Sequence, residues 1–302
     1  MTSTNPEWAV QGRARFLPAI AKIARFAMNR RGLESRLLDV GGRRVHVYDG
    51  KGTGSLPPLV LVHGLGSAGA AFARVAARLL PHFQRVIIPE LPGHGFSPHG
   101  GVPITPALLL ESTTLAIEHL LREPAFVYGN SLGGAIAIKY ALHRPESVRG
   151  LVLVSPAGAR LADDEWRSLV ETFRVKGPRD AREFLARLYH KPPWFLPIVA
   201  QEFPHLLATP AVREILEHAT QENAHRPEEL GALAMPVLFV WGRSEKLLPS
   251  SALAFFREHL PKHAVVEEPF GFGHTPQLET PDRVADRILA FARAHAEAPK
   301  PI

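Results

Sequence analysis

Short, uninterrupted runs of apolar residues, each ending at a loop that contains glycine or serine, limit the folds open to this chain more than any other feature. Such a run is typical of a strand buried on both faces of a parallel sheet, and clear examples are Leu59–Val62, Leu151–Val154 and Val237–Trp241. Helical patterns fill the intervals from Arg43 onward. This alternation predicts an α/β fold, a mostly parallel sheet with helices on both faces.

Further elements follow from the same patterns. Two strands at Ser35–Val40 and Arg43–Tyr48, joined by Gly41-Gly42, are expected to form an antiparallel edge. Other strands are predicted at residues 85–90, 125–128 and 264–266, and helices at 69–80, 106–122, 132–143, 250–260 and 280–297.

One segment, residues 157–232, interrupts the alternation because it contains helical patterns and no convincing strand. We interpret it as a helical cap inserted over the carboxyl ends of the strands, where sheets of this type place their binding crevice. The predicted organisation is a basic N-terminal helical segment (1–34), a first core part (35–156), the cap (157–232) and a second core part (233–302). Most of the cap aromatics are expected to be core residues: Trp166, Phe173, Phe184, Tyr189, Trp194, Phe195 and Phe203.

The N-terminal segment carries much of the net charge of +6. Its cations are Arg13, Arg15, Lys22, Arg25, Arg30 and Arg31. An apolar stripe is expected to oppose them, formed by Phe16, Leu17, Ile20, Ile23 and Phe26. The segment is interpreted either as a solvated helix face or as a peripheral contact with an anionic membrane. An Arg-rich stretch nearly free of acids is also compatible with an organelle transit peptide in a eukaryotic source.

Composition excludes several classes of protein. There is no cysteine, so disulfides, thiol nucleophiles and cysteine metal sites are ruled out. The sequence contains no run of 18 apolar residues, so no transmembrane helix is predicted. No nucleic-acid-binding motif accompanies the positive charge. We expect a cytoplasmic protein that binds a small-molecule substrate, with no nucleic-acid partner; the sequence leaves its oligomeric state open.

The sharpest local motif is Gly129-Asn130-Ser131-Leu132-Gly133, which matches G-x-S-x-G. It follows the apolar strand that ends at Tyr128 and precedes a helical run, which is the setting the motif requires. The two glycines leave room for a sharp turn that lifts Ser131 above the sheet, and the following helix directs free N–H groups at the reacting oxygen. Ser131 is therefore the candidate nucleophile.

A serine hydroxyl needs a base, and the base needs an orienting carboxylate. His274 is the candidate base because it lies in a loop between the last predicted strand and the last helix, whereas His63 and His94 lie in other glycine-rich loops. In this fold the acid falls between the serine and the histidine in chain order. Glu245, after the strand 237–241, is the first choice; the alternatives are Glu268, Asp163 and Asp164.

An oxyanion hole is also expected. One donor is the Leu132 N–H, directly after the nucleophile, and the other is the Leu65 N–H, in the loop that follows the strand 59–62.

Together these stretches resemble the α/β-hydrolase superfamily over roughly residues 35–295. The matching pieces are His63-Gly64-Leu65-Gly66, Leu91-Pro92-Gly93-His94-Gly95-Phe96-Ser97, Gly129–Gly134, Trp241-Gly242 with Pro249, and Gly273-His274. The resemblance implies an eight-stranded sheet, a cap after the sixth strand, no cofactor and no metal. Similar proteins usually carry aspartate after Trp-Gly, where this chain has Glu245.

The resemblance also narrows the chemistry. Relatives that open epoxides or remove halide use aspartate at the elbow, so Ser131 indicates acyl transfer to water. We expect hydrolysis of a medium-sized, largely apolar carboxylic ester. One alternative is a carbon–carbon bond hydrolase acting on ring-fission products of aromatic compounds, although the loop after His63 lacks the Gly-Pro-Gly continuation of those enzymes. The other is a non-hydrolytic protein that uses the fold to bind a ligand.

Overall fold

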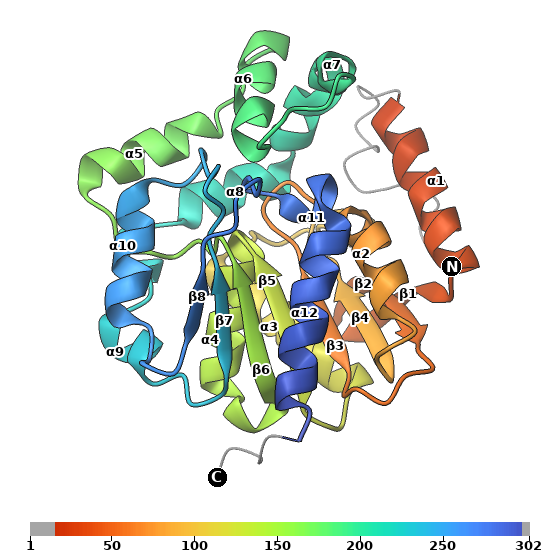
Figure 1. Ribbon diagram of the computed structural model, residues 1–302. Helices are drawn as coiled ribbons and strands as arrows, with labels where there is room; N and C mark the ends of the chain where they lie inside the picture. The colour runs from red at the N-terminus through yellow and green to blue at the C-terminus, as the bar shows by residue number, and fades with distance from the viewer. Residues whose placement is uncertain (1–15, 298–302) are drawn as a thin grey trace.

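An eight-stranded sheet forms the centre of the molecule in the computed structural model, which describes residues 16–297 (Figure 1). Across the sheet the order is β1 (Leu33–Val40), β2 (Arg43–Lys51), β4 (Arg85–Pro89), β3 (Leu59–Val62), β5 (Ala125–Asn130), β6 (Val148–Val154), β7 (Val237–Val240) and β8 (Val265–Glu267). β2 pairs antiparallel with β1 and with β4, and all other neighbours are parallel. The predicted mostly parallel α/β sheet with an antiparallel edge is confirmed.

The β1–β2 hairpin turns at Gly41 and Gly42, and Val40 pairs with Arg43 across the turn. Both glycines have positive φ angles, 58° and 71°. A two-residue turn of this kind requires positive φ at both central positions, which glycine adopts without a steric penalty.

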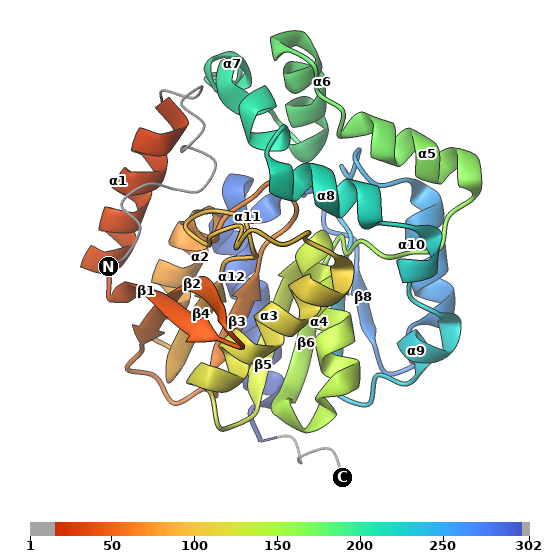
Figure 2. The same cartoon turned by 180° about the vertical axis from the view of Figure 1, so that it is seen from behind.

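Helices cover both faces of the sheet (Figures 1 and 2). On one face lie α2 (Ala73–Leu79), which follows a short 3-10 turn at Gly69–Phe72, and α12 (Pro281–His295), which follows the short α11 (Pro276–Glu279). On the other face lie α3 (Pro106–Leu120), α4 (Leu132–His143) and α10 (Ser250–His259). Alternate strand residues supply the two buried cores: Leu59 and Leu61 belong to the first, Val60 and Val62 to the second.

Residues 157–232, all within the described part of the chain, contain helices and no strand. Four of them, α5 (Asp163–Thr172), α6 (Pro178–Leu188), α7 (Leu196–Leu207) and α8 (Pro210–His218), lie over the carboxyl ends of the strands (Figure 1). The last, α9 (Pro227–Gly231), packs beside α10 instead. That this whole segment forms a separate cap stays a prediction.

The aromatic residues of the segment divide into three groups. Phe184 and Phe203 are buried in a small apolar cluster of α6, α7 and α8, with ring centroids 5.6 Å apart. Trp166 and Phe173 line a cavity described below. Trp194 and Phe195 are 86% and 45% exposed and lie outside the core.

Helix α1 (Phe16–Arg30) precedes the sheet and packs beside β1 (Figure 2). Met28 is its buried residue. The predicted cations Arg13 and Arg15 lie outside the described residues. No helix within residues 16–297 is long and apolar enough to cross a membrane.

Candidate active site

Ser131 occupies a strained turn between β5 and α4. Its backbone angles are φ 54° and ψ −122°, and its carbonyl accepts hydrogen bonds from Gly134 N at 2.8 Å and Ala157 N at 2.9 Å. Positive φ is unusual for a residue with a side chain and has an energetic cost that the surrounding structure must offset. The turn therefore holds the hydroxyl in a fixed position at the carboxyl end of the sheet.

The glycines of the motif are required by close backbone contacts. A Cβ atom on Gly129 would lie 2.4 Å from the Gly133 carbonyl oxygen, and one on Gly133 would lie 2.2 Å from the Val62 carbonyl oxygen. Neither distance is compatible with a side chain. The glycines of the motif thus allow α4 to pack closely against β3 and β5.

The strain at Ser131 leads to a stability prediction. Ser131→Gly should raise the free energy of unfolding by about 1 kcal/mol, because glycine adopts this conformation without the steric cost. Thermal or denaturant unfolding of the wild type and the variant measures the difference. A matched change at Ser112, a buried serine in the helix α3, should instead destabilise, because glycine weakens a helix interior. A Ser131→Gly variant less stable than the wild type would contradict the prediction.

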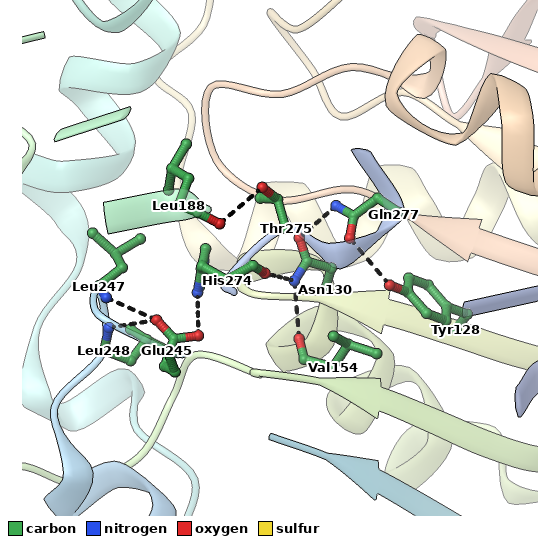
Figure 3. Close-up of polar contacts among 10 residues, drawn as sticks. All are labelled: Tyr128, Asn130, Val154, Leu188, Glu245, Leu247, Leu248, His274, Thr275 and Gln277. Atoms are coloured by element: carbon green, nitrogen blue, oxygen red, sulfur yellow. Dashed lines mark hydrogen bonds and ion pairs between the residues drawn. The ribbon is translucent and has the colours of Figure 1, made fainter. Parts of the chain in front are cut away.

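His274 and Glu245 form a buried pair. His274 Nδ1 lies 2.8 Å from Glu245 Oε2, and the two side chains are 3% and 2% exposed. The other carboxylate oxygen accepts hydrogen bonds from Leu247 N at 2.8 Å and Leu248 N at 3.1 Å. These backbone donors fix the orientation of the carboxylate, and the carboxylate in turn fixes the imidazole ring (Figure 3).

The environment of Glu245 keeps its carboxyl group ionised. Burial by itself raises the pKa, but the charge of His274, the hydrogen bond to its ring, the nearby Ser155 hydroxyl and the Leu248 N–H outweigh burial and leave the pKa below its ordinary value. An ionised carboxylate at Nδ1 favours the tautomer that leaves Nε2 free to accept a proton.

A buried amide network connects the loop of His274 to Asn130, the last residue of β5 (Figure 3). Asn130 Nδ2 donates to the carbonyl oxygens of His274 at 2.9 Å and Val154 at 3.0 Å. Gln277 Nε2 donates to Asn130 Oδ1 at 2.9 Å. Sequence reasoning did not identify Asn130 or Gln277; the only signal was the amide at the second position of the motif.

Ser131 and His274 are thus held at adjacent loop ends, since Asn130 is the residue directly before the serine. Within residues 16–297 no hydrogen bond joins the Ser131 hydroxyl to the His274 ring. Catalytic hydrogen bonds of this kind are often long in a site without substrate and shorten in the reacting complex.

The rival histidines have structural partners. His63 Nε2 accepts from Leu91 N at 3.1 Å, so its proton lies on Nδ1, which donates to the Gly64 carbonyl at 2.9 Å. His94 Nδ1 donates to the Pro92 carbonyl at 3.0 Å. Burial lowers the pKa of both, to about 4 for His94. Both rings are therefore neutral and brace the two glycine-rich loops.

The rival acids lie elsewhere. Glu268 forms an ion pair with Arg257. Asp163 and Asp164 are exposed in the first turn of α5. Among the candidates, Glu245 is the acid that the structure brings to His274.

The two expected oxyanion donors lie close to the serine: Leu132 directly follows it, and Leu65 lies in the loop after β3. A Cβ atom on Gly64 would be 3.1 Å from Ser131 Cβ, so the loop that carries Leu65 passes directly beside the nucleophile. Within the described residues, neither Leu65 N nor Leu132 N donates a hydrogen bond to another group. Both are therefore available to a bound substrate.

A cavity of about 480 Å³ opens beside Ser131, within the range of sites that hold small organic ligands. Its walls are mainly apolar and come from α3, α4, α5 and the end of α8; representative residues are Leu65, Leu109, Leu132, Ile136, Trp166 and Phe173. Polar residues such as Lys139 and His225 also contribute. No group of three or more His, Asp or Glu side chains within residues 16–297 is placed to hold a metal ion.

Comparisons with known proteins agree with the fold. A family model described as alpha/beta hydrolase fold matches residues 57–281. The chain is 28% identical over 286 residues to Lipase 1 of Psychrobacter immobilis, which covers 89% of this chain and 87% of that protein. It is 30% identical over 262 residues to a pimeloyl-(acyl-carrier protein) methyl ester esterase of Xanthomonas axonopodis pv. citri (strain 306), covering 78% and 94%. The solved structure of a membrane phospholipase A, a bacterial virulence factor, aligns with a TM-score of 0.77 and 25% identity over 94% of this chain and 92% of that one.

Proposed function

The chain belongs to the α/β-hydrolase fold family, and from this premise we propose that it is a serine hydrolase that cleaves carboxylic esters of medium-sized, largely apolar substrates. The observation that carries the proposal is Ser131 on its strained turn, beside an apolar cavity and next to the loop of the His274–Glu245 pair. Relatives named as a lipase and a methyl ester esterase, over most of the chain, support the same reaction.

In the proposed reaction Ser131 Oγ attacks the ester carbonyl while His274 Nε2 takes the hydroxyl proton. The N–H groups of Leu65 and Leu132 stabilise the oxyanion. His274 then gives the proton to the leaving alcohol as the C–O bond breaks. Water, deprotonated by His274, attacks the acyl-enzyme. The bond between the acyl carbon and Ser131 Oγ breaks, His274 returns the proton to Oγ, and the carboxylic acid leaves. Glu245 remains ionised throughout and stabilises the imidazolium.

A panel of substrates tests the function. We expect the purified protein to hydrolyse p-nitrophenyl esters, with kcat/KM highest for acyl chains that fill the cavity, and Ser131→Ala to abolish the activity.

A coloured dienol–ketoacid from aromatic ring fission tests the carbon–carbon hydrolase alternative. Turnover of the ketoacid without turnover of any ester would assign carbon–carbon bond hydrolysis in place of ester hydrolysis. Ligand binding without turnover, unaffected by Ser131→Ala, would support a non-hydrolytic role.

The position of Ala135 allows a prediction about acyl length. Ala135 lies one helical turn after Ser131 and lines the cavity. Ala135→Leu should lower kcat/KM for hexanoyl and longer esters by about tenfold or more, because the added methylenes occupy space that the chain needs. Acetyl esters should be little affected, and Ala290→Leu, an exposed position of α12, serves as the matched control. Equal losses for short and long esters would contradict this.

The partner is proposed to be a small ester, and the location to be cytoplasmic. We also propose peripheral membrane contact through the N-terminal segment, which fits the similarity to a membrane phospholipase A.

A further inference from the structure

The apolar face of α1 points away from the protein. Phe16, Ile20, Ile23 and Phe26 recur at the spacing of one helix face and are 62%, 53%, 67% and 66% exposed. In contrast, the guanidinium of Arg25 turns inward and lies 4.2 Å from the centroid of the Phe96 ring. A helix that packs against a globular core normally has the reverse orientation. Packing within the chain therefore does not account for the exposed apolar side chains of α1.

A second exposed apolar segment lies at the same corner of the molecule. Trp194, Phe195 and Ile198, at the start of α7, are 86%, 45% and 57% exposed. Glu202, one turn after Ile198, joins α7 to the beginning of α1: its carboxylate accepts hydrogen bonds from Phe16 N at 2.7 Å and Leu17 N at 2.8 Å. The two elements meet at this corner (Figures 1 and 2). We call these seven exposed residues the docking face.

The charged side chains between Phe16 and Leu33 have one sign. Lys22, Arg30 and Arg31 are exposed, and no acidic residue occurs between Phe16 and Leu33. Glu202, which joins α7 to α1, is buried and bound to the N–H groups of α1. An exposed apolar face edged by cations matches the interfacial region of an anionic bilayer. There the apolar side chains contact acyl chains, and the cations bind phosphate groups.

We propose that the docking face binds the surface of an anionic phospholipid bilayer, with α1 lying in the interface and Trp194 inserted beside it. Aromatic and aliphatic side chains insert into the interfacial region of a bilayer, and cations are attracted to its negative charge. Because α7 is one of the helices over the carboxyl ends of the strands, this orientation brings that side of the molecule to the membrane. The inference concerns binding and does not depend on which bond Ser131 cleaves.

Vesicle flotation with the full chain tests the proposal. The wild type should bind vesicles of equal parts phosphatidylcholine and phosphatidylglycerol, and bind phosphatidylcholine vesicles more weakly. Ile23→Glu or Trp194→Glu should lower the partition coefficient by about tenfold or more, because a buried apolar contact becomes a charge facing anionic lipid. Each of Lys22→Gln, Arg30→Gln and Arg31→Gln should weaken binding to the anionic vesicles by about fivefold.

Val265→Glu is the matched control, since Val265 is 52% exposed on β8, at the edge of the sheet opposite β1. It should leave vesicle binding unchanged, and all these variants should retain hydrolysis of a water-soluble ester, which separates lipid binding from catalysis. Absence of wild-type binding to anionic vesicles, or equal binding by Ile23→Glu, would overturn the proposal. A dimer in solution that Ile23→Glu dissociates, without vesicle binding, would assign the face to a second copy of the chain instead.

Discussion

Ser131→Ala should lower kcat for ester hydrolysis by about a millionfold, because the variant loses the covalent step and retains only binding and oxyanion stabilisation. The fold should persist: Ser131 N and O contribute the turn hydrogen bonds through the backbone, and alanine keeps these. Single-turnover kinetics with a p-nitrophenyl ester measures the loss, and mass spectrometry should detect an acyl group on the wild-type serine only.

The control for this variant is another buried serine. Ser112 lies in α3, is 1% exposed, and its hydroxyl has no hydrogen-bond partner in the described part of the chain. Ser112→Ala should keep wild-type kinetics. Activity of Ser131→Ala within tenfold of the wild type would mean that this hydroxyl is not the nucleophile.

Glu245→Gln should lower kcat roughly a thousand- to ten-thousandfold with little change in KM. Glutamine lacks the charge that stabilises the imidazolium, and its amide can present a donor to His274 Nδ1, which favours the wrong tautomer. Steady-state kinetics together with circular dichroism separates lost chemistry from lost fold. Glu268→Gln is the matched control because Glu268 pairs with Arg257, and it should retain nearly full activity. Reversed effects in the two variants would assign the acid to Glu268.

The same pair predicts a difference in pH dependence. The pKa of Glu245 is lower in the folded chain than its ordinary value of 4.5, so its ionised form stabilises the fold above that pH. This contribution is lost as the pH falls from about 4.5 through the folded pKa. The free energy of unfolding, measured with urea, should therefore fall more steeply on acidification for the wild type than for Glu245→Gln. Parallel curves would show that His274 gives Glu245 no net stabilisation.

The elements of the sheet were predictable because their signals are local. A run such as Leu59–Val62 is apolar on both faces, and this pattern is sufficient for a buried strand. The segment Gly129–Gly133 specifies its own turn through residue size. The boundaries were less predictable: β5 continues to Asn130, two residues beyond the predicted strand, because its backbone pairs with β6 up to Val154. Pairing of this kind depends on the neighbouring strand.

The position of β4 between β2 and β3 was not predictable from the order of the strands in the chain. The bracing of His274 by Asn130 and Gln277 likewise joins residues about 145 positions apart, and neither residue has a local pattern that marks it. The orientation of α1 was also open, since an apolar stripe shows that a helix is two-sided and not which side meets solvent.

By itself, the sequence determined the secondary elements, the strained turn at Ser131 and the class of fold, because each depends on the size and polarity of neighbouring residues along the chain. Only the tertiary structure decided which carboxylate reaches His274, which loops border the cavity and which side of α1 is exposed. Those outcomes depend on contacts between distant segments, and such contacts form when the two buried cores on either side of the sheet bring the segments together.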